Sequence, residues 1–211
     1  MDVFSVTECG GKNFHLVHTC VKAGSVAKGT VHSAFQYGGE KCWACSRMYV
    51  PDSTWPKIKQ ELLVCHKNNK IGDPVEDFST FFSAVMDNKS SARNKQWPDH
   101  TESSPNLKVM AGSNCDSSKA YFVEPTMVES AEPQDPMVNQ EILGPDLCVS
   151  VNPENRYKEV LQPMDNTSLY APTVATVATV PMVPVMAKHH VLAGHIDIDT
   201  CSPCHLIFNK Q

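Results

Sequence analysis

The strongest constraint on the fold is a regular alternation of short apolar runs and helix-period segments between residues 8 and 165. Residues 14–17 (FHLV), 107–110 (LKVM) and 147–151 (LCVSV) have the length and apolar content of buried strands. Between such runs lie segments, among them residues 25–37, whose apolar side chains fall on one helical face. Since parallel strands need a long crossover between them, this alternation predicts an α/β domain with a mostly parallel sheet.

Turn and capping signals bound the expected helices. The helix over residues 25–37 should end at Gly38 and Gly39, where a left-handed C-cap costs little. A second helix should begin with Ser53 as its N-cap and Pro56 in its first turn. Further expected elements are strands at residues 48–50 and 121–123, a loop at 72–74, a polar helix at 89–96 and a helix at 155–161.

The character of the chain changes after Asp165. Residues 166–187 contain no charged residue, repeat Thr-Val-Ala, and include three prolines and four threonines. This composition forms helix poorly, so a transmembrane helix is not expected despite the length of the uncharged run. The sequence therefore predicts a domain over residues 1–165 and a divergent, poorly ordered tail over residues 166–211, with no membrane partner.

Charge and cysteine content exclude several classes of protein. Eighteen Lys and Arg against 23 Asp and Glu give a net charge of −5, and no long basic run is present, which argues against a nucleic-acid partner. Nine cysteines at irregular spacing argue against a secreted disulfide scaffold. The first residues (MDVF) have the features of neither a signal peptide nor a transit peptide.

The segment with the most chemical content is residues 35–47 (FQYGGEKCWACSR). A thiol at Cys42, just after two glycines, is placed to meet a substrate, and Lys41 beside it would favour the thiolate. The competing interpretation is an inert small hydrophobe. The C-x-x-C of Cys42 and Cys45 suggests zinc or redox chemistry, but no second ligand pair lies at the usual spacing, so no metal site is expected.

A second cysteine motif lies near the C-terminus. Residues 201–205 (CSPCH) have the letters of a c-type haem attachment site. Such a site needs an export context and a distal ligand in a helical fold, and neither is indicated here. We therefore do not expect haem.

Three segments carry a family resemblance. Residues 8–13 (ECGGKN), 38–42 (GGEKC) and 141–145 (EILGP) resemble, in this order, signature segments of the aldehyde dehydrogenase superfamily. Residues 72–78 (GDPVEDF) and 121–125 (YFVEP) are similar to the branch that oxidises L-glutamate γ-semialdehyde in proline degradation. The resemblance extends to about residue 170, and implies the catalytic-domain fold of that superfamily without its N-terminal dinucleotide-binding domain.

The resemblance implies a role for three residues. Cys42 matches the nucleophile that attacks the aldehyde carbon and gives a thiohemiacetal, then a thioester after hydride transfer to NAD. Glu8 matches the general base that activates water for thioester hydrolysis. Glu141 matches the residue that binds the nicotinamide-ribose hydroxyls. The implied partner is a small aldehyde, the cofactor is NAD, and the implied location is the mitochondrial matrix, or the cytoplasm for the chain as it stands.

Departures from the family support an alternative. The expected dinucleotide-binding half does not precede Glu8, Glu40 stands where the family has glutamine, and Leu143 stands where it has phenylalanine. The extra charge of Glu40 is expected to disfavour a thiolate at Cys42. The carboxylate-anchoring loop and the oligomerisation strand have no evident match in the tail, so the family's homo-oligomer is not expected. The alternative is an inactive fragment or pseudoenzyme that docks onto a full-length relative.

Overall fold

The computed structural model describes residues 11–118, 120–156, 159–160, 167–168, 173–177 and 195–198, the last two ranges by their backbone. The strands are β1 (Asn13–Val17), β2 (Cys45–Pro51), β3 (Leu107–Ala111), β4 (Cys115–Asp116), β5 (Phe122–Val123), β6 (Thr126–Ser130), β7 (Asp146–Asn152), β8 (Thr173–Val177) and β9 (His195–Ile198). The helices are α1 (Ala23–Phe35), α2 (Trp55–Asn68), α3 (Asn88–Ser103) and α4 (Pro136–Asn139), with 3-10 turns η1 (Gln36–Gly39) and η2 (Glu154–Arg156).

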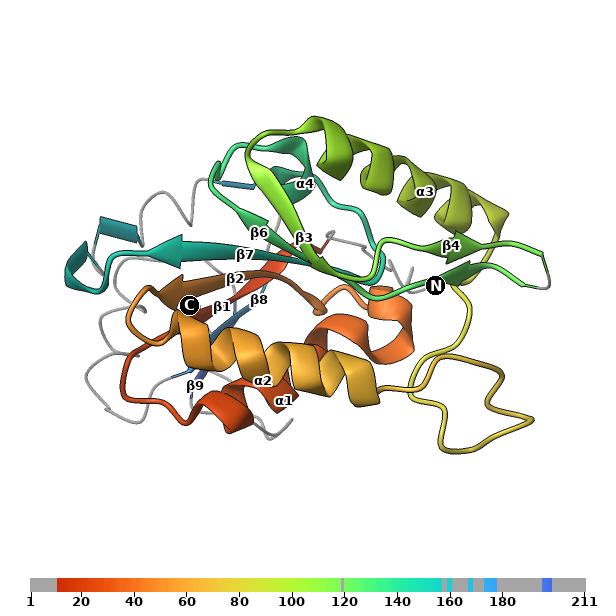
Figure 1. Cartoon of the computed structure of the whole chain (residues 1–211), viewed down its shortest axis with the longest axis horizontal. Helices are drawn as coiled ribbons and strands as arrows, with labels where there is room; N and C mark the ends of the chain where they lie inside the picture. Colours follow the sequence, from red (N-terminus) through yellow and green to blue (C-terminus); the bar gives the residue numbers. More distant parts are fainter. Residues whose placement is uncertain are drawn as a thin grey trace, which may run out of the picture.

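A seven-stranded sheet runs through the described part of the chain in the order β3-β6-β7-β2-β1-β8-β9 (Figure 1). Every pairing in this sheet is parallel except that of β3 with β6. Strands β4 and β5 form a separate antiparallel pair. The expected α/β class with a mostly parallel sheet is therefore confirmed.

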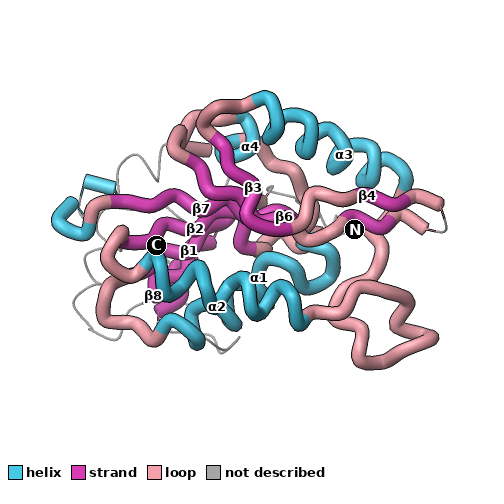
Figure 2. The backbone as a smooth tube through the Cα atoms, in the orientation of Figure 1, coloured by secondary structure: helices cyan, strands magenta, loops and turns pink. Residues whose placement is uncertain are grey.

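The two faces of the sheet are covered by different helices (Figures 1 and 2). Strand β7 shows why, because its side chains alternate between two cores. Leu147 and Val149 pack in one apolar cluster with residues of α1 and α2, whereas Cys148 packs in another with Trp97 of α3 and Met137 of α4. Alternation along a strand thus builds a three-layer molecule from one sheet.

Strand β2 lies in the middle of the sheet and is buried along its whole length. Its one cation, Arg47, is 1% exposed and lies 4.9 Å from the centroid of the Phe14 ring. The Arg47 Nε donates to the carbonyl of Lys12 at 3.0 Å, and Nη1 donates to the Tyr49 hydroxyl at 3.3 Å. These bonds to buried acceptors offset the desolvation of the guanidinium group and tie β2 to the start of β1.

Helix boundaries follow the sequence signals in part. Helix α1 runs into η1, where Tyr37, Gly38 and Gly39 have φ of 54°, 71° and 64°, so the left-handed C-terminal turn is confirmed. Helix α2 corrects one expectation, because its N-cap is Thr54 and not Ser53. The backbone N–H of Ser53 instead donates to the Asp52 carboxylate at 2.8 Å.

Other expected elements are shifted or extended. Helix α3 is longer than the expected 89–96: the Asp87 carboxylate accepts from the Ser90 N–H at 2.7 Å and caps a start at Asn88, and the helix continues past residue 96 to Ser103. Strand β6 was not expected from the sequence. Of the helix expected at 155–161, residues 159 and 160 are helical, residues 155 and 156 belong to η2, and the other three lie outside the described residues. Most of the expected tail, 166–211, also lies outside them, although β8 and β9 pair in the main sheet.

Candidate active site

Cys42 lies in the loop between η1 and β2, and its side chain is exposed. The side-chain amide of Asn13, at the start of β1, donates to the carbonyl of Cys42 and, at 3.3 Å, to that of Ala44. Strands β1 and β2 are adjacent and parallel, so the sheet positions both Asn13 and the segment just before β2 that contains Cys42 and Ala44. The loop backbone is therefore fixed while the thiol faces outward.

Glu141 lies close to the same loop although it is distant in sequence. Its Oε1 atom accepts a hydrogen bond from the backbone N–H of Gly11. A Cβ atom placed on Gly11 would lie 3.1 Å from Glu141 Oε1 and 3.3 Å from the Cys42 carbonyl oxygen. The structure thus brings Cys42 and Glu141 together around a residue that has no side chain.

Glu8, the third expected site residue, lies outside the described residues. Its place beside Cys42 stays a prediction. The motif that contains it continues into the described residues Gly11, Lys12 and Asn13, and two of these contact the Cys42 loop or Glu141.

The Lys41 ammonium group contacts Gln36 and two aromatic rings. Its Nζ donates to Gln36 Oε1 at 3.0 Å and lies 4.2 Å from the centroid of the Tyr37 ring. The Trp43 ring is 5.6 Å away, and both rings are exposed. The structure therefore places the Lys41 charge next to two exposed aromatic rings. Aromatic ring faces attract a cation such as this ammonium group.

Cys45 differs sharply from Cys42. It is buried, its Sγ donates to the carbonyl of Arg47 at 3.2 Å, and burial raises the pKa of its thiol to about 12. The two cysteines of the C-x-x-C segment therefore sit in different environments. Among the described residues no group of three or more His, Cys, Asp or Glu side chains is placed to hold a metal, and residues 201–205 lie outside that part.

Glu40 points its carboxylate toward the first turn of α3. Ser90 Oγ donates to Glu40 Oε1, and the backbone N–H of Met86 donates to Oε2 at 2.9 Å. The positive end of a helix dipole stabilises an anion at this place. The Glu40 carboxylate, which the sequence suggested would act on Cys42, thus accepts hydrogen bonds from Ser90 of α3 and from the segment just before it.

A buried ion pair lies next to Gly11. Lys12 Nζ and Asp146 Oδ2 are 3.1 Å apart, with side chains 0% and 5% exposed. Burial raises the pKa of Asp146, an effect that the neighbouring Lys12 opposes. The pair joins the residue before β1 to the first residue of β7, and so ties the Gly11 segment to the chain that follows Glu141.

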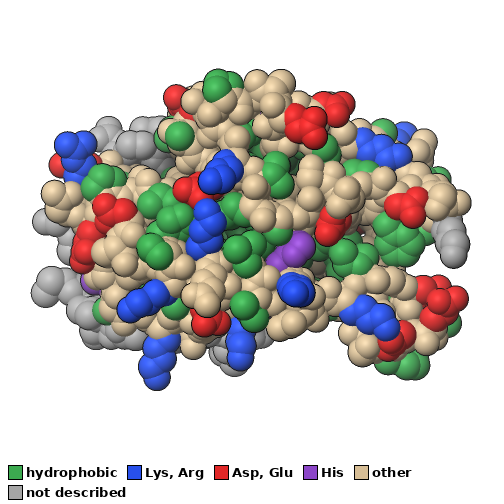
Figure 3. All heavy atoms as spheres, in the orientation of Figure 1, with side chains coloured by type: hydrophobic (Ala, Val, Ile, Leu, Met, Phe, Trp, Pro, Cys, Tyr) green, Lys and Arg blue, Asp and Glu red, His purple; other side chains and the backbone are tan. Residues whose placement is uncertain are grey.

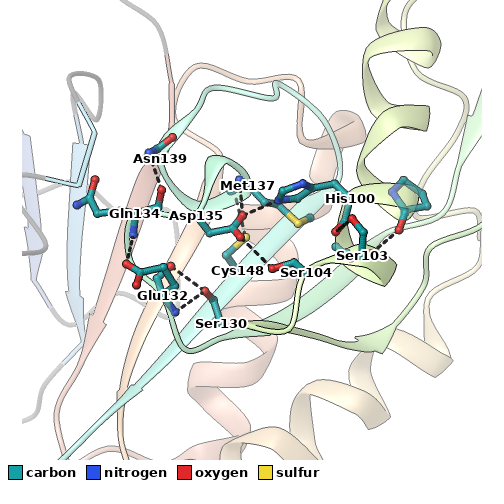
Figure 4. A network of polar contacts seen from close by, with 12 residues as sticks. His100, Ser103, Ser104, Ser130, Glu132, Gln134, Asp135, Met137, Asn139 and Cys148 are labelled. Carbon is teal, nitrogen blue, oxygen red and sulfur yellow. Dashed lines mark hydrogen bonds and ion pairs between the residues drawn. The ribbon is translucent and has the colours of Figure 1, made fainter.

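The segment before Glu141 is anchored by Asp135 (Figure 4). The Asp135 carboxylate caps α4 by accepting from the Met137 N–H at 2.9 Å. It also contacts His100 Nε2 at 2.9 Å and accepts from Ser104 Oγ at 3.2 Å, both from the end of α3. Helix α4 is thereby held against α3 just before the chain reaches Glu141.

A small cavity of about 20 Å³ lies between α3 and the start of β7. Its lining includes Trp97, Thr101, Met137 and Asp146 but neither Cys42 nor Glu141. A space of this size is close to that of one water molecule. The candidate site is therefore the surface around Cys42 and not this cavity.

The outer surface carries charges of both signs. On the face drawn in Figure 3, acidic and basic side chains are interspersed. In the part of the chain that the structure describes, no helix is both long and apolar enough to cross a bilayer.

Comparison with known proteins decides the family. Residues 4–198 match the family described as "Aldehyde dehydrogenase family". This chain belongs to the aldehyde dehydrogenase family. The resemblance that the three sequence segments indicated is confirmed, and the family match extends beyond residue 170.

Two similar members of the family carry the same name. The chain is 62% identical over 168 residues to "Delta-1-pyrroline-5-carboxylate dehydrogenase, mitochondrial" of Danio rerio, and 57% identical over 168 residues to that of Homo sapiens. Each match covers 80% of this chain and 30% of the relative. The chain thus spans about a third of the length of these relatives.

Solved structures agree with the fold of this chain. Delta-pyrroline-5-carboxylate dehydrogenase from Mycobacterium tuberculosis bound with NAD superposes with a TM-score of 0.84 at 28% identity, over 96% of this chain and 36% of that one. The same enzyme bound with NAD and cobalamin superposes with a TM-score of 0.86 at 30% identity, over 95% of this chain and 37% of that one. The chain thus matches a little over a third of the length of these structures.

Proposed function

We propose that this chain carries the nucleophile and a cofactor contact of an NAD-dependent enzyme that oxidises L-glutamate γ-semialdehyde to L-glutamate. The observation that carries the proposal is the meeting of the exposed Cys42 loop and the Glu141 carboxylate at Gly11. The identity of 62% with a dehydrogenase named for pyrroline-5-carboxylate, the cyclic form of this semialdehyde, supports the substrate class. The names of the relatives support a mitochondrial location.

Each residue has a defined task in this reaction. The Cys42 thiol loses its proton to water, the thiolate attacks the aldehyde carbon, and the Cys42 backbone N–H stabilises the oxyanion of the resulting thiohemiacetal. Bound NAD would supply the acceptor for the hydride of this carbon, and loss of that hydride would leave a thioester on Cys42. Glu8 then takes a proton from the water that hydrolyses the thioester, releasing glutamate and the free thiol.

The described residues fit the proposed cofactor at one point. A carboxylate has two oxygens, and Oε1 of Glu141 is occupied by the Gly11 N–H. We assign Oε2 of Glu141 to the ribose hydroxyls of NAD. Gly11 suits this place because a side chain there would press against both Glu141 and the Cys42 carbonyl.

The test is formation of NADH and glutamate by the purified chain from L-glutamate γ-semialdehyde. Cys42→Ser should abolish both products because the sulfur is the attacking atom, whereas Cys65→Ser, at a half-buried cysteine of α2, should leave them unchanged. Products that persist in Cys42→Ser would exclude the proposed nucleophile.

A second candidate is an inactive fragment that docks onto a full-length relative. The observation that favours it is the coverage of only 30% of the relatives' length. Calorimetric titration with NAD separates the two: micromolar binding contradicts the second candidate. Absence of binding, together with formation of a complex with a full-length relative, supports it.

A further inference from the structure

The loop before Cys42 and the loop after Glu141 touch backbone to backbone. Gly39 has a φ of 64°, and a Cβ atom placed on it would overlap the carbonyl of Gly144. A Cβ atom on Gly144 would in turn overlap the side chain of Asn94, on α3. Three segments therefore meet here without room for a side chain: the end of η1, the loop at residues 142–144 and the first half of α3.

Arg93 of α3 holds the loop that follows Glu141. Its Nε donates to the carbonyl of Ile142 at 2.5 Å, and its Nη2 donates to the carbonyl of Leu143 at 3.1 Å. Leu143 has a φ of 53°, a backbone conformation that a leucine adopts only under constraint. The guanidinium group supplies that constraint through two charge-assisted hydrogen bonds.

Ser90 links Arg93 to the other loop. The Ser90 hydroxyl accepts from Arg93 Nη2 at 3.2 Å and donates to Glu40 Oε1. One hydroxyl can do both, since it has one proton and free lone pairs. The buried Ser90 thus lies between a cation that binds one loop and an anion that belongs to the other.

Glu40 completes the connection two residues before Cys42. Its second oxygen accepts from the Met86 N–H at 2.9 Å, so the carboxylate is held by both the helix and the segment that leads into it. The Asp87 carboxylate caps the same turn through the Ser90 N–H. The turn that carries Ser90 is therefore itself ordered.

We propose that Glu40, Ser90 and Arg93 are positioning residues that hold the Cys42 loop and the Glu141 loop in one fixed relation. The assignment of these loops to nucleophile and cofactor contact rests on the proposed function. The mechanical coupling itself stands on the hydrogen bonds and can be measured without turnover. It also gives a role to Glu40, the residue whose charge at first suggested a weaker nucleophile.

Hydrogen exchange on the full chain tests the coupling. Arg93→Met removes the donors but keeps a long side chain, and should raise exchange about tenfold in peptides that cover residues 141–144. It should also raise exchange in residues 40–43, which Arg93 does not touch in the described contacts, while the centres of β2 and β7 stay protected. Glu40→Ala should show the reciprocal effect at residues 142–143.

Two variants serve as controls. Lys89→Met removes an exposed cation one residue before Ser90 and should change neither loop. Arg93→Lys can donate to one loop carbonyl and should restore part of the protection, which a purely space-filling role of Arg93 would not predict.

Each outcome decides the matter. Exchange that rises only in residues 141–144, or in neither loop, overturns the proposal. If Arg93→Met raises exchange throughout the chain, the test is repeated with Ser90→Ala, which removes only the shared hydroxyl. Exchange in the peptides that cover residues 40–43 and 141–144 then decides between the outcomes. Coupling, together with NADH formation that persists in Cys42→Ser, would retain the positioning role and remove the proposed function. NADH formation that Cys42→Ser abolishes, without coupling, would do the opposite.

Discussion

Cys42 and Cys45 are three positions apart, and burial gives them opposite chemical character. Cys42 is exposed in a loop, while Cys45 is the first residue of the central strand β2. The buried thiol lies where a negative charge would lose its hydration, so it stays protonated. The local sequence does not show which of the two thiols is buried. The start of β2 decides this, because Cys45 lies in the buried strand and Cys42 lies in the loop before it.

We predict that iodoacetamide at pH 8 labels Cys42 well before Cys45. Burial raises the pKa of Cys45 from 9.0 to about 12, which makes its thiolate about a thousandfold rarer than that of an ordinary thiol. Peptide mapping by mass spectrometry after partial alkylation measures the order. Cys42→Ser should not redirect the label to Cys45; early labelling of Cys45 in the native chain would contradict the burial argument.

A second prediction concerns His15, which is buried in β1 with its Nδ1 atom 3.1 Å from the Thr30 hydroxyl. Burial lowers the pKa of His15 from 6.5 to about 4. The unfolded chain takes up this proton below pH 6.5 and the folded chain does not, so stability is full above pH 6.5 and falls toward pH 4. From pH 7 to pH 5 the His15 contribution to the free energy of unfolding should fall by about 2 kcal/mol.

Urea unfolding at the two pH values measures this loss. His15→Gln should reduce the pH dependence, because no proton then binds at this position in the unfolded chain. His32→Gln, at an exposed position of α1, should keep the pH dependence of the unmodified chain. If the free energy of unfolding of His15→Gln fell between pH 7 and pH 5 as much as that of the unmodified chain, His15 would be excluded as the cause.

At the scale of elements, the Lys12–Asp146 pair connects β1 and β7 across the strand that separates them, β2. A buried pair is costly to break on one side because the remaining charge has no compensation. Lys12→Met or Asp146→Leu alone should lower the free energy of unfolding by about 3–5 kcal/mol, and the double variant should lower it by less than either. Urea unfolding of the four proteins measures the coupling.

A surface pair provides the matched comparison. Lys59 of α2 and Glu129 of β6 are 2.7 Å apart, with both side chains 30% exposed. Breaking this pair should cost about 0–1 kcal/mol, since water solvates the remaining charge. If the two pairs had equal effects, burial would not be the source of the Lys12–Asp146 stabilisation.

Elements differ in how far their sequence predicts them. Strands β1 and β7 were expected because each is a compact apolar run, and α1 because of its helical period and glycine end. Strand β6, Thr126–Ser130, mixes polar and apolar residues, and it is a strand because it pairs with β7 on one side and β3 on the other. Pairing partners that are distant in sequence leave no local signal.

At the scale of the whole molecule, this chain spans 30% of the length of its relatives. Cofactor, aldehyde and thiol must be held together for hydride transfer, and such positioning supplies a large part of the rate. We predict that the isolated chain turns over L-glutamate γ-semialdehyde at no more than about a thousandth of the rate of the full-length Danio rerio relative. NADH absorbance measures both rates; comparable rates would show that these residues suffice.

The sequence by itself determined the α/β class, the family and the identity of the two candidate residues that the structure describes, Cys42 and Glu141. These follow from local apolar patterns and from short motifs, which need no knowledge of contacts. The tertiary structure decided which groups surround them. Gly11 lies between the two loops, Lys41 lies near two aromatic rings, and Glu40 is hydrogen-bonded to α3 through Ser90. The physical reason is that hydrogen bonds and burial depend on distance in space, and the sheet brings together segments that the chain keeps far apart.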